Sequence, residues 1–519
     1  MEYAGRNLRS SLQRSNTPTL HCVDSHTQRT RAIALTGFVV LCFVAWLAFE
    51  IPKGILTNTD ELFTAERSRE MLLTNPWTVH FNFQRSVQKP PLQYWLTTLT
   101  LPRFENSTLA VRIWPAIYAV LTVIVTAWLA VLIDPTRQWL MLLAAAILVT
   151  CPLFTAEAGR ALLDVGLAFY TTLAIVFAQL ARKRPACWLG VAVVCWLGSL
   201  QKIPLIFLVW LVIVVVRLSS TFERRERSVL SNWLIASVIL AIAATAAWPL
   251  IQMTNYGVPM GSEFHKEATA RLWPQHLGTR PYLEIPFRLS MTGWIVGGFF
   301  AFIAPFAVLF WREQRFSTAA KEIAIVCITV IALAVLFNFR SVRYIVPIVP
   351  CLALLLAIVL HRLLEQRPLI RIGAMALLGT ILLAGIAQAK AQVYFRQRNV
   401  SGGFVDGRVR LRIGDEAVAD EKRVAEELGA LQNATTKTLL IKAARAGSDP
   451  HNDSFYLFHG NLRFPVVKLT VEQLRRAPPS PPVAGVCVQR DFPVVQEVYP
   501  NVKIEFTRDQ FILWRVNAQ

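Results

Sequence analysis

Charged side chains stand at the ends of several long apolar segments of this chain. Asp60 and Glu61 follow the first apolar segment, and Asp164 lies near the end of another. Lys202 and Arg343 stand at similar junctions further along. Ionisable residues beside an apolar layer are costly unless they are paired or hydrated, so they are candidates for function. A carboxylate beside several cations suits a reaction in which a phosphate leaves and a hydroxyl is deprotonated.

Polar residues in two long loops extend this set. The first loop contains Lys89 and Tyr94, the second contains Glu267 and Arg271, and Tyr344 begins a later apolar segment. The catalytic candidates are Asp60 and Asp164, and the substrate-binding candidates are Glu61, Lys89, Tyr94, Lys202, Glu267, Arg271, Arg343 and Tyr344. We assign no metal ligands.

Each kind of candidate also has a purely structural interpretation. Asp60 and Glu61 could cap a helix expected over 62–73, since acidic residues favour the first turn of a helix. Lys89 could lie in a turn before two prolines and extend its charge to the membrane surface. His265 stands alone, which is more typical of a structural or exposed histidine than of a metal ligand.

The composition is that of an integral membrane protein. Of the 519 residues, 54% are hydrophobic and 17% are charged, where a soluble domain carries about 25% charged residues. Mean hydropathy is +0.44. The eight cysteines form no CxxC pair, which argues against a zinc cluster or a disulfide framework.

Eleven apolar segments predict membrane-spanning helices, because each is about long enough to cross the hydrocarbon core. They lie at about 32–51, 109–133, 138–156, 161–181, 186–200, 203–217, 230–251, 289–311, 322–338, 344–361 and 369–389. The fifth and sixth are short and could be tilted or re-entrant. Two long polar loops, 52–108 and 252–288, interrupt the series.

The distribution of Lys and Arg predicts the orientation. Clusters such as 182–184 and 224–227 fall in alternate turns, and the opposite turns carry few cations. By the positive-inside rule the N-terminus is then cytoplasmic, and both long loops and the C-terminal region face outward. The net charge of +20 therefore suits membrane headgroups rather than nucleic acid.

The chain divides into three regions on these grounds. Residues 1–31 predict a disordered cytoplasmic tail, 32–390 a transmembrane catalytic domain, and 391–519 a small extracytoplasmic α/β domain. In the last region we expect a helix over 416–431 and strands over 438–442, 455–458, 464–469, 483–488 and 511–516.

Several polar motifs together resemble one family of membrane enzymes. They are Asp60-Glu61, Arg69-Glu70-Met71-Leu72, Lys89-Pro90-Pro91-Leu92 with Tyr94-Trp95-Leu96, Arg112, Arg160 to Asp164, Gln201-Lys202 before Pro204, and Arg343-Tyr344 before Pro347. This pattern resembles the membrane glycosyltransferases of the GT-C class, over roughly 33–390. Aminoarabinose (lipid A) transferases and protein O-mannosyltransferases are the nearest in pattern.

The resemblance implies a fold and a set of roles. It implies a GT-C fold, a sugar donor linked to polyprenyl or dolichyl phosphate, and inversion at the anomeric carbon. Asp60 matches the family's catalytic aspartate, and Lys89 matches the lysine that meets the carrier phosphate. Asp164 matches a second acidic position, Lys202 a basic cavity residue, and Tyr344 a tyrosine that lines the cavity.

The chain departs from the aminoarabinose-type pattern at three positions. Gln88 replaces a glutamate before the lysine, and Ala268 replaces a histidine after Glu267. Thr64 replaces an aromatic residue four positions after the aspartate. The first two changes remove plausible metal ligands, so a divalent metal stays open and no metal site is predicted. All three argue against lipid A as the acceptor.

The sequence therefore predicts an inverting glycosyltransferase on the outer side of the cytoplasmic membrane. It would move a sugar from a polyprenyl-phosphate carrier to a glycolipid, a cell-envelope glycan or a protein. A transporter or flippase of lipid-linked sugars would need the same cations but no base, and an inactive scaffold is a third alternative. The absence of a clear internal repeat and the gathering of charges on one side favour the enzyme over the transporter.

Overall fold

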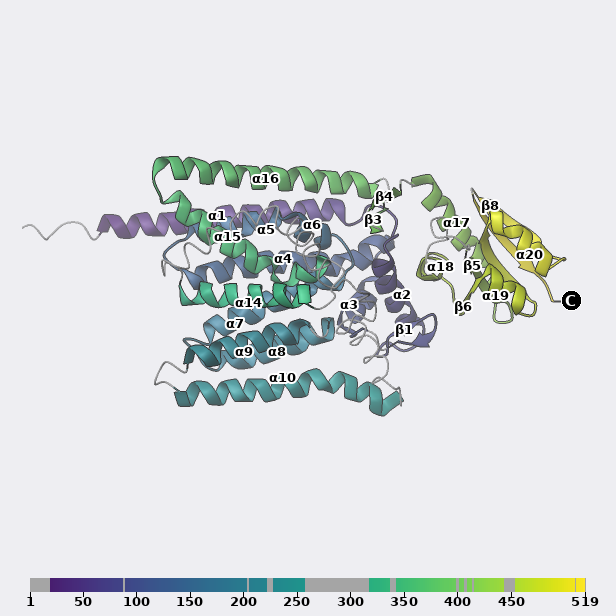
Figure 1. Ribbon diagram of the computed structural model, residues 1–519, viewed down its shortest axis with the longest axis horizontal. Coiled ribbons are helices and arrows are strands. Elements are labelled where there is room, and N and C mark those ends of the chain that lie inside the picture. The colour runs from purple at the N-terminus through teal and green to yellow at the C-terminus, as the bar shows by residue number, and fades with distance from the viewer. Residues whose placement is uncertain are drawn as a thin grey trace, which may run out of the picture.

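A bundle of long helices forms one part of the molecule, and a small α/β domain lies at one end of it (Figure 1). The computed structural model describes residues 19–86, 89–202, 205–221, 227–256, 317–336, 342–397, 401–405, 408–412, 415–442, 453–508 and 510–518. The predicted combination of a helical membrane part with a small C-terminal sheet is confirmed.

The apolar segments predicted to span the membrane are mostly helical where the structure describes them, with breaks such as 150–151 and 161–162. The helices are α1 (Thr19–Glu50), α4 (Ser107–Ile133), α5 (Trp139–Val149), α6 (Pro152–Ala158), α7 (Leu163–Leu180), α8 (Cys187–Gln201), α9 (Leu205–Thr221), α10 (Arg227–Tyr256), α14 (Thr318–Leu336), η1 (Val342–Ile348, a 3-10 helix), α15 (Val349–Leu364) and α16 (Pro368–Gln397). The segment predicted at 289–311 lies outside the described residues.

The number of membrane spans in the described residues is smaller than the eleven predicted. Six helices there are long and apolar enough to cross a membrane, and the bent pair α5 and α6 makes a seventh if it is one span. The two halves of that pair meet at 67°, because Pro152 cannot continue the hydrogen bonding of the preceding helix. The helix α8 is apolar but has only 15 residues.

The first helix begins earlier than expected. The predicted disordered tail reached residue 31, but α1 starts at Thr19. Extending a helix by one residue costs far less than nucleating one, so a long apolar helix can carry a polar extension. Residues 1–18 lie outside the described part of the chain.

The helix bundle has a packed interior and an apolar exterior. Buried alanines on α4, α5 and α7 let these helices approach closely, and the hydroxyls of Tyr118 and Tyr170 are 2.9 Å apart between α4 and α7. Large apolar side chains are exposed on the outer helices, such as Phe38 on α1, Ile239 on α10 and Leu383 on α16. Such an exterior fits lipid rather than water.

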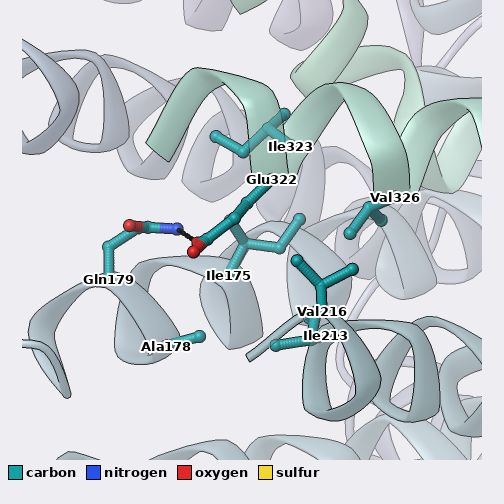
Figure 2. A pocket seen from close by; sticks show the side chains of 8 residues that line it. All are labelled: Ile175, Ala178, Gln179, Ile213, Val216, Glu322, Ile323 and Val326. Atoms are coloured by element: carbon teal, nitrogen blue, oxygen red, sulfur yellow. Dashed lines mark hydrogen bonds between the residues drawn. The ribbon is translucent and has the colours of Figure 1, made fainter. Parts of the chain in front are cut away.

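A buried polar cluster joins three helices at one end of the bundle. Figure 2 shows Glu322 of α14 and Gln179 of α7 pointing toward each other among apolar side chains, and their side chains are 3.2 Å apart. The carboxylate of Glu322 also pairs with Arg182 at 2.7 Å and with Arg217 of α9 at 3.3 Å. These contacts satisfy a charge that would otherwise be costly to bury.

Two short helices and a hairpin lie between the bundle and the C-terminal domain. They are α2 (Thr59–Leu73), the hairpin of β1 (His80–Phe81) and β2 (Gln84–Arg85), and α3 (Leu92–Thr100). The cap of α2 is Asn58, whose side chain accepts from the amides of Asp60 and Glu61 at 2.9 and 3.4 Å. Asp60 and Glu61 are therefore not the N-cap residues, although both stand in the first turn of α2, as that interpretation expected.

The C-terminal region contains a five-stranded sheet in the order β6-β5-β7-β9-β8. Its elements are α17 (Asp415–Leu431), β5 (Lys437–Lys442), α18 (Asp453–His459), β6 (Val466–Thr470), α19 (Val471–Arg476), β7 (Val483–Val488), α20 (Phe492–Val498), β8 (Lys503–Arg508) and β9 (Phe511–Val516), preceded by the hairpin of β3 (Ser401–Val405) and β4 (Arg408–Arg412). Strand β5 is parallel to β6 and β7, whereas β9 is antiparallel to β7 and β8.

One predicted strand of this region is a helix, and one strand of the sheet has no counterpart among the predictions. The strand predicted at 455–458 is part of the helix α18, because a short continuous apolar run does not distinguish a buried strand from a buried helix. The edge strand β8 was not predicted, since its side chains are largely exposed and mostly polar.

Candidate active site

A cavity of about 170 Å³ lies where the helix bundle meets α2 and α3. It is lined by Asp60, Phe63, Thr64, Arg67, Lys89, Tyr94, Leu162, Leu163, Asp164, Lys202, Arg343 and Tyr344. These residues come from positions nearly 300 apart in the sequence, and the fold brings them to one place. The shared cavity expected for Asp60, Lys89, Asp164, Lys202 and Arg343 is present.

The carboxylate of Asp60 is paired with the guanidinium of Arg343. Asp60 stands in the first turn of α2, where the helix dipole favours a negative charge. The exposed fractions of the two side chains are 47% for Asp60 and 25% for Arg343. The pair is thus partly open to the cavity, and a ligand can reach it.

A second pair lies deeper, where α7 begins and α8 ends. The Nζ atom of Lys202 is 2.5 Å from an oxygen of Asp164, and both residues are buried. The ring centre of Tyr344 is 4.6 Å from the ammonium of Lys202 and 5.8 Å from the guanidinium of Arg343. The aromatic ring therefore lies close to both cations, an arrangement that a cation–π interaction stabilises.

Lys89 and Tyr94 reach the cavity from the segment around α3. Lys89 precedes the two prolines after which α3 begins, so its position is fixed by the start of that helix. Tyr94 is on the buried face of α3, and its hydroxyl accepts a hydrogen bond of 2.8 Å from Arg67.

Arg67 is a cavity residue that the sequence analysis did not select. Its guanidinium lies 5.3 Å from the ring centre of Phe63, 5.6 Å from that of Tyr94 and 5.8 Å from that of Phe81. It stands seven residues after Asp60 on α2, and a spacing of seven places two residues on the same helix face. That spacing was the signal that could have identified it.

Glu61 does not line the cavity, which corrects its assignment to substrate binding. Its carboxylate pairs with Arg112 of α4 at 2.8 and 3.1 Å and accepts the amide of Ala161 at 2.9 Å. Arg112 also donates to the carbonyl of Lys53 at 2.7 Å. Glu61 therefore holds α2 against α4 and the segment before α7.

Part of the predicted site lies outside the described residues. This applies to Glu267, Arg271 and the second long loop beyond residue 256, and to the altered positions Gln88 and Ala268. Thr64, the third altered position, donates to the carbonyl of Ala161 at 3.0 Å. Within the described ranges no three His, Cys, Asp or Glu side chains are grouped so that they could hold a metal ion.

The C-terminal domain contacts the face of α2 opposite to the cavity. Arg69 is held by Glu66 at 2.7 Å and donates to Asn461 at 3.0 Å and to the carbonyl of Leu462 at 2.7 Å. Asn82, in the hairpin after α2, exchanges two hydrogen bonds with the backbone of Val466, at 2.7 and 2.9 Å. The short helix α2 is therefore fixed on both faces.

Glu70 makes this junction sensitive to pH. Burial and the neighbouring Glu66 raise the pKa of Glu70 from 4.5 to about 8, although the amide of Phe83 and the charge of Arg69 oppose the shift. A raised pKa favours the protonated carboxyl in the folded protein. The contribution of Glu70 to the stability of the fold is therefore complete below its ordinary pKa of 4.5. This contribution is lost as the pH rises from there through about 8, because the buried carboxyl must then ionise.

We expect Glu70→Gln to flatten the decline in stability between pH 5 and pH 9. Glutamine keeps an acceptor for the amide of Phe83, 2.7 Å away in the present protein, but cannot ionise. Thermal unfolding of the purified protein in lipid at both pH values measures this. Glu105→Gln, at an exposed acid before α4, is the control. An equal decline for wild type and Glu70→Gln would contradict the expectation.

Comparison with known proteins agrees with this architecture. Residues 57–254 match the family described as dolichyl-phosphate-mannose-protein mannosyltransferase. An undecaprenyl phosphate-alpha-4-amino-4-deoxy-L-arabinose arabinosyl transferase 2 of Sodalis glossinidius is 33% identical over 175 residues, 32% of each chain. The corresponding transferase of Pseudomonas savastanoi is 31% identical over 233 residues, 43% of this chain and 41% of that one. The aligned part thus spans well under half of these relatives.

Solved structures extend the likeness to nearly the whole chain. ArnT from Cupriavidus metallidurans, bound to undecaprenyl phosphate, superposes with a TM-score of 0.68 at 16% identity, covering 93% of this chain and 97% of that one. The archaeal oligosaccharyltransferase AglB from Archaeoglobus fulgidus gives 0.52 at 12% identity, covering 79% and 62%.

The fold is therefore that of the GT-C class of membrane glycosyltransferases, as the sequence motifs predicted. Within that class the chain is similar to the aminoarabinose transferases and to the protein mannosyltransferases.

Proposed function

We propose that this protein is an inverting glycosyltransferase that takes its sugar from a polyprenyl-phosphate carrier. The observation that supports this most strongly is the cavity in which Asp60 and Asp164 lie among four cations. A leaving phosphate needs positive charge, and an attacking hydroxyl needs a carboxylate to receive its proton. The acceptor is a hydroxyl of a glycolipid, a cell-envelope glycan or a protein.

The reaction exchanges one bond at the anomeric carbon for another. The acceptor oxygen attacks this carbon from the face opposite the phosphate, and the bond to the phosphate oxygen breaks. Asp60 receives the proton of the acceptor hydroxyl, and the carrier leaves as polyprenyl phosphate. Asp164 orients the sugar or the acceptor.

The cations have distinct parts in this scheme. Lys89 holds the phosphate, and Arg343 and Lys202 add positive charge as the phosphate leaves. Tyr344 lines the cavity beside the last two. The positive-inside bias supports placing the cavity on the outer side of the cytoplasmic membrane, where lipid-linked donors and envelope acceptors meet.

The relatives support the choice of donor. The structural neighbour ArnT is bound to undecaprenyl phosphate, and the curated relatives are named for transfer of arabinose derivatives from that carrier. A transporter of lipid-linked sugars would use the same cations without needing Asp60 as a base. The effect of replacing Asp60 therefore distinguishes a transferase from a transporter.

The deciding experiment is sugar transfer by the purified protein in lipid. A panel of undecaprenyl-phosphate sugars is offered together with membrane extracts as the source of acceptor, and the carrier-linked sugar remaining is measured for wild type and Asp60→Asn. Consumption of one donor that requires Asp60 supports the transferase. Donor binding without consumption of any sugar would instead favour a transporter.

Lys89→Ala is expected to weaken donor binding about tenfold or more, because it removes a charge-assisted contact to the phosphate. Binding of undecaprenyl phosphate to the protein in nanodiscs measures the effect. Arg85→Ala is the matched control, since Arg85 is an exposed cation in the same loop and does not line the cavity. Equal donor affinity of Lys89→Ala and wild type would remove the phosphate-binding role of Lys89.

A further inference from the structure

We propose that Gln201 is a positioning residue of this transferase, whose buried amide holds α3, α7 and α8 in the arrangement that the reaction needs. This inference rests on the proposed function and concerns a residue behind the cavity rather than in its lining. It follows from two hydrogen bonds of one side chain and from the residues that stand next to its partners.

Gln201, the last residue of α8, links two other helices through its side-chain amide. Its Nε2 atom donates to Oε1 of Gln93 on α3 at 3.0 Å and to the carbonyl of Leu163 at the start of α7 at 3.3 Å. The amide carries two hydrogens, so it can make both bonds at once. Gln93 and Gln201 are fully buried. These two bonds, called the amide bridge below, join three separate helices at one point.

Each of the three residues in the amide bridge is followed directly by a residue of the cavity. Tyr94 follows Gln93, Asp164 follows Leu163, and Lys202 follows Gln201. Consecutive residues share a planar peptide unit, so a shift of one of these helices moves its cavity residue with it. The amide bridge therefore sets the distances among side chains that the proposed reaction uses.

The surroundings of the amide bridge are apolar. Leu92 and Leu200, which precede the two glutamines, pack with Trp95 and Trp248 in one cluster. Apolar contacts have no preferred direction, so they permit small displacements of one helix against another. A hydrogen bond is stronger in apolar surroundings and weakens steeply when its geometry changes. The amide bridge therefore restricts position, whereas replacing both glutamines by apolar residues of similar shape should change stability little.

Gly166 leaves the space that the amide of Gln201 occupies. A Cβ atom at residue 166 on α7 would lie 2.5 Å from Nε2 and 2.8 Å from Cδ of Gln201. The end of a glutamine side chain can move aside, so alanine would displace the amide rather than the helix. Alanine also favours a helix more than glycine does. Gly166→Ala should therefore break the amide bridge without weakening α7 or replacing any side chain of the cavity.

The test measures kcat and donor affinity of Gly166→Ala in lipid. The donor is the undecaprenyl-phosphate sugar that the wild type consumes, and affinity is measured with undecaprenyl phosphate in nanodiscs. We expect kcat to fall about tenfold or more, since a misplacement of about 1 Å can cost roughly 10²-fold. Donor affinity should change less than about threefold, because the attraction between charges varies only slowly with distance.

Gly190→Ala is the matched control. A Cβ atom at residue 190 would lie 2.7 Å from the ring of Phe177, near the other end of α8, so this variant introduces a similar clash away from the amide bridge. It should keep the wild-type kcat per molecule that binds donor. Gln201→Met removes the amide bridge by a different change. Adding Gln93→Met to it should lower kcat no further, because the bond between the two residues is already lost.

The outcomes separate this inference from the function on which it rests. Wild-type kcat in Gly166→Ala or Gln201→Met would overturn the inference, and so would an equal loss in Gly190→Ala. Deuterium exchange needs no sugar transfer, and loss of the amide bridge should speed it in peptides that cover α3 more than in the rest of the bundle. If the wild type consumes no donor, the proposed function fails. Faster exchange of α3 in Gly166→Ala would then still uphold the amide bridge as the contact that positions this helix, and unchanged exchange would reject it.

Discussion

Asp60→Asn is expected to lower the rate of sugar transfer by about 10²–10⁴-fold, the contribution of a general base. Asparagine has nearly the same shape but cannot accept the proton of the acceptor hydroxyl. The loss should appear in kcat with the affinity for the donor little changed, because the proposed mechanism assigns the phosphate to the cations rather than to Asp60. Initial rates at saturating donor, with donor affinity measured in parallel, test this.

The fold should tolerate that change. The side chain of Asp60 is 47% exposed, so water can solvate Arg343 when its partner is neutral. Glu105→Gln is the matched control, since it neutralises an exposed acid in the same polar loop. Wild-type transfer by Asp60→Asn would exclude Asp60 as the base, and equal losses in both variants would point to general loss of charge.

Arg112→Leu is expected to destabilise the protein by roughly 3–5 kcal/mol, the usual cost of leaving a buried charge without its partner. Glu61 would then remain buried beneath α2 without the guanidinium that pairs with it, although the amide of Ala161 would still donate to it. The helix that carries Asp60 would lose its attachment to α4. Thermal or denaturant unfolding in lipid measures the change, and loss of transfer should accompany it.

Adding Glu61→Gln to Arg112→Leu should recover part of that stability, because the double variant has no buried charge to compensate. Glutamine also keeps an acceptor for the amide of Ala161. If the double variant were no more stable than Arg112→Leu alone, lost packing rather than lost charge pairing would explain the effect. Glu61 would then contribute less to the position of α2 than its contacts suggest.

The gathering of the cavity residues could be predicted because the membrane restricts topology strongly. Once the spans and their orientation are inferred, Asp60, Asp164, Lys202 and Arg343 must lie at the same end of the bundle. Their unusual charge beside apolar segments marks them as well. The pairing within this set, Asp60 with Arg343 and Asp164 with Lys202, depends on side-chain distances that topology alone does not specify.

Other features depend on tertiary packing that leaves little trace in the sequence. Glu61 and Asp60 are adjacent, yet they point to different surroundings, because consecutive helix residues are about 100° apart. The sequence does not distinguish Arg67 from the other charges of α2, because its aromatic neighbours come from three separate segments. The run 455–458 forms a helix because α18 packs against α2 and α17.

The attachment of α2 on both faces couples regions that could otherwise evolve separately. One face presents Asp60 and Arg67 to the cavity, and the other is bound through Arg69 to the loop that follows α18. A rigid helix of 15 residues transmits a displacement of either end almost undiminished. A displacement of the C-terminal domain is therefore expected to move Asp60, the proposed base, so substitutions in that domain should alter the rate of transfer without touching the cavity.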